Sequence, residues 1–189
     1  GAGAGPAAAG PAMNAGDLML TMRVVTTPAD FEQVFLLRSK VFVGEQKVDE
    51  AIEFDEHDRA ALEFAKAAGG GEEPDTVFVA AFDAGAASTG KTRIVGTARM
   101  VLLDDGWGKV GRVAVAREAR SKGVGRAVML FLEQAAVKRR LAGLTLGSQV
   151  QALPFYERLG YQPVPGSDYV EAGMPHVRCL KQVVQPEQA

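Results

Sequence analysis

Apolar and β-branched residues gather in short runs along this chain, and turn-forming residues separate most of these runs. Runs of this length are typical of strands that are buried on at least one face. We therefore predict strands over residues 18–25, 77–82, 93–102, 109–115, 144–149, 161–164 and 175–181. Short connections join the early runs, which favours antiparallel pairing in the first half of the sheet.

Between several of these runs, apolar residues recur at the spacing of an α-helix. We predict helices over residues 27–44, 127–141 and 152–159, and either a short helix or a strand over residues 60–68. Thr27 as N-cap and Pro28 in the first turn open the first helix, and Gly143 is expected to end the second.

The order of these elements predicts a mixed α/β fold with a mostly antiparallel, twisted sheet. The helix at 127–141 crosses between the strands at 109–115 and 144–149. Because a crossover of this kind joins parallel strands, these two strands should form a parallel pair. We expect about six or seven strands in the sheet and about four helices beside it.

A loop with two glycines, residues 120–126, joins the strand at 109–115 to the following helix. Backbone N–H groups and the positive end of the helix dipole converge there, and such a spot binds phosphate or pyrophosphate. Gly123 and Gly125 lack a Cβ, so that a ligand can approach the main chain closely. Positive charge comes from Arg120, Lys122 and Arg126. The alternative is a helix start whose glycines merely suit the turn. The P-loop and dinucleotide-binding motifs are missing.

The arrangement Arg-x-x-Gly-x-Gly after a short strand, here residues 120–125, resembles motif A of the GCN5-related N-acetyltransferases (GNATs). Residues 151–161, QALPFYERLGY, resemble the family signature A-x-x-F-Y-E-x-L-G-F, with Tyr161 in place of the usual Phe. Residues 38–46 and 53–58 fit R-x-x-V-F-V-x-E-Q and E-x-D-x-x-D, which look like the ElaA-like branch of the family. The first two matches occur in the family's order, with one helix and one strand between them.

This resemblance implies a splayed parallel strand pair that holds acetyl-CoA as cosubstrate. The pantetheine arm would lie against residues 113–115 like an added strand, and loop amides would hold the pyrophosphate. The implied cofactor-binding residues are Val113, Ala114, Val115, Arg120, Ser121, Lys122, Gly123, Val124, Gly125, Arg126, Gln149 and Phe155. The implied reaction moves the acetyl group to a primary amine, expected to be a small molecule, by direct attack in a ternary complex. A backbone N–H near Val115 would stabilise the oxyanion.

Three side chains are candidates for catalytic proton transfer. Tyr156 could protonate the departing thiolate, although a core tyrosine with its hydroxyl on a main-chain carbonyl is the alternative. His176 could be the base, because imidazole titrates near neutral pH, or it could be structural. Glu45 lies in the acidic stretch 45–58, which is either a solvated loop or a wall of the acceptor site. The base could also be a water held by Glu45 or Gln149.

Composition narrows the classes of protein. The formal net charge is −2, hydrophobic residues make up 47% and charged residues 23%, as in ordinary globular domains. A role in binding nucleic acid or an anionic membrane gets no support, and no apolar run approaches the roughly 20 residues of a membrane span. Cys179 is the single cysteine and His57 lies far from His176 in sequence, so we expect no disulfide within the chain and no metal site. A reducing, cytoplasmic location fits this cysteine usage.

We expect one acetyltransferase domain over residues 17–184, preceded by a flexible Gly/Ala/Pro-rich leader over 1–16 and followed by a tail over 185–189. Coenzyme A and a small amine are the expected partners, and strand edges near the C-terminus could pair two copies into a homodimer. The alternative function is a non-catalytic CoA sensor or protein-interaction domain of the same fold. The intact glycine loop together with Tyr156 favours the enzyme.

Overall fold

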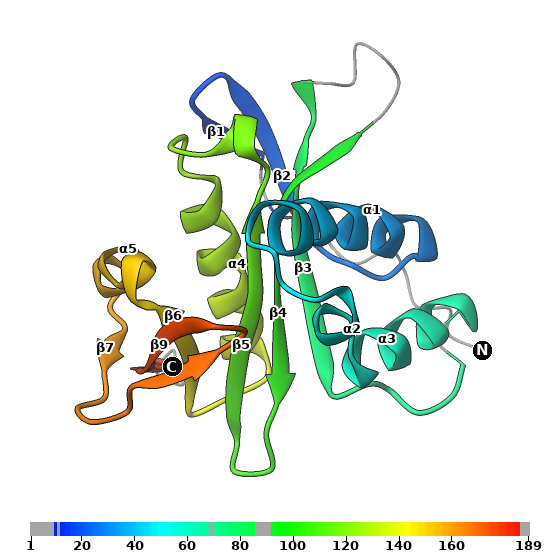
Figure 1. The fold of residues 1–189 in the computed structure, drawn as a ribbon. Helices are drawn as coiled ribbons and strands as arrows, with labels where there is room; N and C mark the ends of the chain where they lie inside the picture. The colour runs from blue at the N-terminus through cyan, green and yellow to red at the C-terminus, as the bar shows by residue number, and fades with distance from the viewer. Residues whose placement is uncertain (1–9, 11, 69, 86–91, 186–189) are drawn as a thin grey trace.

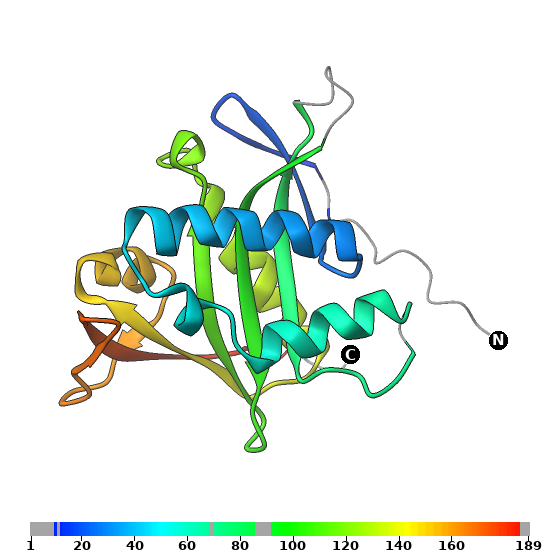
Figure 2. The same cartoon turned by 45° about the vertical axis from the view of Figure 1, so that its right-hand side comes forward.

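The central strands are deeply buried, because helices cover them on both sides. A computed structural model describes residues 10, 12–68, 70–85 and 92–185 (Figure 1). Every residue of β3 (Thr76–Asp83) is buried, as are most residues of β4 (Arg93–Leu102). Figure 2 shows α1 (Pro28–Arg38) and α3 (Glu56–Lys66) in front of these strands and α4 (Val124–Lys138) behind them.

The described strands form one mixed sheet, which confirms the predicted fold class. Its order is β1 (Met13–Ala15), β2 (Leu18–Val24), β3, β4, β5 (Trp107–Val115), β6 (Gly143–Gln149), β9 (Met174–Gln182) and β7 (Gln162–Pro163), while β8 (Tyr169–Glu171) pairs with β9. Neighbours are antiparallel except for β5 and β6, which are parallel as predicted. The sheet has nine described strands, more than the expected six or seven, since the sequence pattern missed the three-residue strands β1 and β8.

Two predicted boundaries are wrong. Met13–Ala15 pairs with β2, so the expected leader over residues 1–16 extends too far, although residues 1–9 and 11 lie outside the described residues. The helix predicted to end at Gly143 instead ends at Lys138. Arg140 then adopts a left-handed conformation with φ of 56°, and Gly143 opens β6, where any side chain would collide with the ring of Trp107.

The remaining helical segments follow from local capping. Thr27 accepts a hydrogen bond from the N–H of Asp30 at 3.2 Å, which confirms the predicted start of α1. Asp55 and Asp58 form a reciprocal capping box, and of the segment predicted as helix or strand over residues 60–68, residues 60–66 continue helix α3. The other segments are a π-helix over Ser39–Glu45, α2 (Glu50–Glu53), 3-10 turns over Arg117–Ala119 and Val150–Ala152, and α5 (Leu153–Arg158).

A cluster of buried charges joins the helical layer α1–α3 to the sheet. This buried ion cluster consists of Arg38, Glu53, Asp55, Asp58, Arg99 and Arg112. Arg38, with 1% of its surface exposed, donates to Glu53 and to Asp58, both at 2.6 Å. Arg99 of β4 donates to the same Asp58 at 2.9 Å. Three cations therefore balance three anions, and each loses water only in exchange for charged hydrogen bonds.

Replacing Arg38 by Met should lower the free energy of unfolding by about 3–5 kcal/mol, because Glu53 and Asp58 lose a buried partner. The measurement is urea denaturation followed by circular dichroism. Lys66→Met is the matched control, since the ion pair between Lys66 and Glu63 is exposed on both sides and should contribute less than about 1 kcal/mol. Equal effects of the two substitutions would contradict a stabilising role of the buried ion cluster.

Candidate active site

The cleft of this molecule begins where β5 and β6 stop pairing. Their parallel ladder runs only from Trp107 and Gly143 to Val110 and Leu146. Beyond it, β5 stays paired with β4 as far as Val115, and β6 stays paired with β9 to its end. Each strand thus follows its own half of the sheet, and the two carboxyl ends splay apart as the predicted fold requires.

A β-bulge shapes the β5 side of this cleft. Arg112 has φ of 52°, and the register with β4 shifts between Thr97 and Arg99. The N–H of Ala116 donates to Val95 of β4, so by alternation the main chain of Val115 faces away from β4. The Nε of Arg120 donates to the Val115 carbonyl at 3.1 Å, which leaves the N–H of Val115 for a ligand.

The loop before α4 presents an open helix N-terminus. Gly123 is the N-cap with φ of 84°, no side chain caps the helix, and no acidic residue occupies its first turn. Main-chain N–H groups are therefore available to an anion. Gly125 lies under Phe155, whose Cζ would be 3.3 Å from an added Cβ. Val124 has only 1% of its surface exposed, so its side chain belongs to the core.

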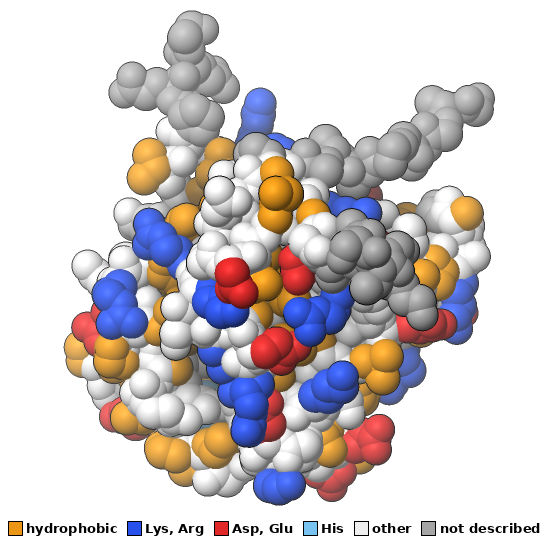
Figure 3. All heavy atoms as spheres, turned by 90° about the horizontal axis from the view of Figure 1, so that it is seen from above, with side chains coloured by type: hydrophobic (Ala, Val, Ile, Leu, Met, Phe, Trp, Pro, Cys, Tyr) orange, Lys and Arg blue, Asp and Glu red, His pale blue; other side chains and the backbone are white. Residues whose placement is uncertain are grey.

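Carboxylates already pair with two cations of this loop. Arg120 donates to Glu45 at 2.9 Å, and Lys122 donates to Asp17 of the β1–β2 turn at 2.6 Å. The exposed Arg126 completes the set. Figure 3 shows the face above this loop, with basic and acidic side chains next to one another at its centre.

The pairing changes the expected role of Glu45. The hydrogen bond from Arg120 holds the pKa of the Glu45 carboxyl below its usual value. A carboxylate stabilised in this way is a weaker base. The structure thus assigns Glu45 an ion pair beside the loop, and this pair would have to open before Glu45 could accept a proton.

The cleft itself has a volume of about 590 Å³, and residues of α2 and α3 line it together with residues of the sheet. The predicted site residues that line it are Val113, Gln149, Tyr156 and His176. Gln149 donates to Gln46 at 2.9 Å, so a polar contact links the end of β6 to the segment after the π-helix. The structure thus gathers side chains from both halves of the sheet around one space.

Tyr156 combines burial with access to the cleft. Its ring packs edge-on against Phe155 with centroids 5.0 Å apart, and against Tyr161 at 6.0 Å. Within the described part of the chain, its hydroxyl makes no hydrogen bond to a main-chain carbonyl. A purely structural core tyrosine would be expected to make such a bond. Burial raises the pKa of Tyr156 from 10.0 to about 12. This phenol is therefore a neutral proton donor at physiological pH.

His176 has a defined tautomer. The ring is buried in β9, and its Nδ1 lies 2.8 Å from the carbonyl oxygen of Met174. Because a carbonyl only accepts, Nδ1 carries the hydrogen and Nε2 is free to accept a proton in the neutral ring. Tyr169 stacks on the imidazole at 5.3 Å, and a Glu171 oxygen lies 3.9 Å from Nε2.

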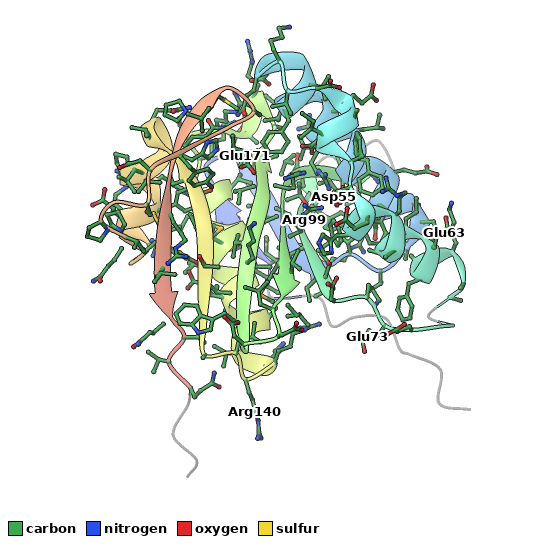
Figure 4. All side chains as sticks on the ribbon, turned by 60° about the horizontal axis from the view of Figure 1, so that its bottom comes forward. Asp55, Glu63, Glu73, Arg99, Arg140 and Glu171 are labelled. Atoms are coloured by element: carbon green, nitrogen blue, oxygen red, sulfur yellow. The ribbon has the colours of Figure 1, made fainter. Side chains whose placement is uncertain are left out.

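Three carboxylates of the acidic stretch are already paired with arginines. Glu53, Asp55 and Asp58 belong to the buried ion cluster, where arginines neutralise them. Figure 4 shows Asp55 next to Arg99 beside α3, and Glu171 on the side of β9. The sequence interpretation missed Tyr169 and Glu171, and their alternating positions in Y-V-E before a glycine turn were the available signal.

Metal binding and membrane spanning are two further properties that the described residues address. Across the described ranges, no group of three or more His, Cys, Asp and Glu side chains could hold a metal ion. Among the described helices, none is long and apolar enough to cross a membrane.

Comparison with known proteins gives consistent similarities. The family model described as acetyltransferase (GNAT) domain matches residues 53–182. YjcF of Bacillus subtilis (strain 168), named as an uncharacterized N-acetyltransferase, is 32% identical over 150 residues, covering 79% of this chain and 91% of that protein. The Escherichia coli ElaA structure has a TM-score of 0.67 at 22% identity, with 86% of this chain and 99% of ElaA covered. A Pseudomonas aeruginosa acyl-CoA N-acyltransferase has a TM-score of 0.64 at 25% identity, with 87% and 99% covered.

Replacing Glu45 by Gln should strengthen binding of inorganic pyrophosphate several-fold, because Arg120 then loses the carboxylate that competes with the anion. Isothermal titration calorimetry measures this change. Glu118→Gln is the control, since Glu118 lies just before the loop but pairs with Arg93 instead of Arg120. Weaker pyrophosphate binding by the Glu45 variant would show that the ion pair assists the loop.

Proposed function

The chain belongs to the GNAT family of N-acetyltransferases, and on this premise we propose that it moves an acetyl group from acetyl-CoA to a primary amine of a small molecule. The family match over residues 53–182 supports acyl transfer as the reaction. The choice of acetyl-CoA, of a primary amine and of direct attack in a ternary complex is our proposal. Support for CoA comes from the open N-terminus of α4, which follows β5 and presents main-chain N–H groups that could bind a pyrophosphate.

The proposed mechanism depends on the position of Tyr156 in the cleft. A thiolate leaves during acyl transfer, and a thiol has a pKa of roughly 8.5, so a positioned proton donor assists its departure. Tyr156 lines the cleft, keeps its proton, and extends from α5 beside the end of β6. The phenol would donate to the thioester sulfur as the C–S bond breaks.

The main chain supplies the other requirements. The pantetheine arm would lie along residues 113–115, and the N–H of Val115 would donate to the developing oxyanion. Gly123 and Gly125 let the pyrophosphate approach the α4 amides, with Arg120, Lys122 and Arg126 around it. His176, with Nε2 free to accept, is the base we propose in preference to Glu45.

Two expectations about context remain proposals. A cytoplasmic location fits the single buried thiol of Cys179. A homodimer through strand edges near the C-terminus would use β7, which lies at one end of the described sheet.

Tyr156→Phe should lower kcat for acetyl transfer about 100-fold or more, because the general acid is lost while the packing remains. Release of CoA thiol in a screen of primary amines measures the rate, and calorimetry should show unchanged affinity for acetyl-CoA. Leu153→Ala in the same helix is the control for altered packing. If the wild-type protein binds acetyl-CoA and acetylates no amine, the alternative of a CoA sensor is supported instead.

The pH dependence gives a separate check on Tyr156. Since burial raises its pKa to about 12, the phenol should lose its proton only at high pH, and the acid step should persist up to about pH 11. When kcat of the wild-type enzyme is measured from neutral pH upward, it should therefore not fall near pH 10.0, where an unperturbed tyrosine loses its proton. A fall of kcat near that pH in the wild-type enzyme that is absent from Tyr156→Phe would contradict the raised pKa of Tyr156.

A further inference from the structure

One charged side chain in the cleft stands apart from the others. Glu53, Asp55, Arg99 and Arg112 line the cleft, but they neutralise one another in the buried ion cluster. His57 lies 3.1 Å from Asp75. Glu56 of α3 and Lys109 of β5 also line the cleft, with opposite formal charges. Glu171 differs from all of these, because its carboxylate oxygen lies 3.9 Å from Nε2 of His176.

A built hairpin holds Glu171 at this position. In β8 and β9, Tyr169 pairs with His176 and Glu171 pairs with Met174. Tyr169 stacks on the imidazole, and its hydroxyl lies so close to Gly147 of β6 that no Cβ fits there. The missing side chain at Gly147 therefore lets the hairpin fold onto β6. Residues of this hairpin line the cleft together with residues of α3 and β5.

We propose that Glu171 and His176 form the acceptor subsite and that the acceptor enters as a cationic ammonium. This inference rests on the proposed function, because it assumes acetyl transfer to an amine. Glu171 attracts the ammonium, and Nε2 of His176 removes one proton to give the neutral amine and an imidazolium. The hydrogen on Nδ1, held by Met174, fixes the ring for this transfer.

Acetyl transfer follows, with each proton accounted for. The amine lone pair forms a C–N bond with the thioester carbon, the C–S bond breaks, and the thiolate takes the phenolic proton of Tyr156. The nitrogen, positively charged after attack, loses its second proton and so restores the phenol. The imidazolium releases its proton to water. One amide, one CoA thiol and one proton are formed for each ammonium and acetyl-CoA consumed.

Glu171→Gln should raise KM for a charged amine about tenfold or more, because a charged hydrogen bond to the substrate is lost, while KM for acetyl-CoA stays unchanged. The probes are benzylamine and putrescine, which are cationic at neutral pH, and trifluoroethylamine, which is mostly neutral. KM for trifluoroethylamine should change little. Asp168→Asn removes the same charge from an exposed neighbour that does not line the cleft, and should leave every KM unchanged. Glu171→Asp should restore part of the lost affinity.

His176→Asn tests the proton acceptor. Asparagine can keep the donor to Met174 but lacks an atom at Nε2, so kcat should fall about 100-fold with KM for acetyl-CoA unchanged. Thermal unfolding shows whether this buried position still folds, and His176→Gln, which retains a polar atom near Nε2, is the second variant if the first is unstable.

The outcomes separate this inference from the proposed function. Acetylation of amines with an unchanged KM in Glu171→Gln would overturn the subsite and leave the acetyltransferase standing. An equal rise in KM for trifluoroethylamine and for the charged amines would also overturn it, because the effect would then be steric. CoA binding without acetylation of any probe would overturn the proposed function itself.

Discussion

The loss of pairing between β5 and β6 is the constraint on which the rest of the structure depends. An unpaired strand end in a protein interior needs partners for its backbone groups. Here the outer neighbours satisfy one edge of each strand, β4 for β5 and β9 for β6, so the inner edges can separate without unravelling the sheet. A ligand that pairs like a strand supplies what the inner edges lack. The cleft is therefore a consequence of sheet topology, and no large insertion is needed to create it.

Arg112 connects this splay to the helical layer. Its left-handed conformation produces the bulge in β5, and its guanidinium donates to the carbonyl of Glu53 and pairs with the Glu53 carboxylate. Burial raises the pKa of Glu53 despite the attraction of Arg38. The strand that would hold the cofactor is thus fixed by the same ion cluster that anchors α2 and α3. Movement of those helices would reach the cleft directly.

Local signals in the sequence were enough for the glycine loop, the start of α1 and the parallel pair, because each depends on residues close together in the chain. Glu45 shows where such reasoning stops. Its acidity depends on Arg120, which is 75 positions away in sequence and adjacent only after folding. Glu53 and Asp58 were equally misleading, since their buried arginine partners lie on other elements. Glu171 was missed because a three-residue strand gives too little periodicity to predict the hairpin.

The two halves of the sheet divide the proposed chemistry between them. Residues expected to hold CoA come mainly from β5 and the start of α4, and they act mainly through main-chain groups. The proton donor and the proposed proton acceptor come from α5 and β9, on the β6 half, and they act through side chains. Main-chain contacts tolerate changes of side chain, whereas side-chain chemistry does not. Because β5 and β6 pair only along the short ladder from Trp107 to Val110, substitutions around the β8–β9 hairpin should alter the choice of acceptor without disturbing the cofactor.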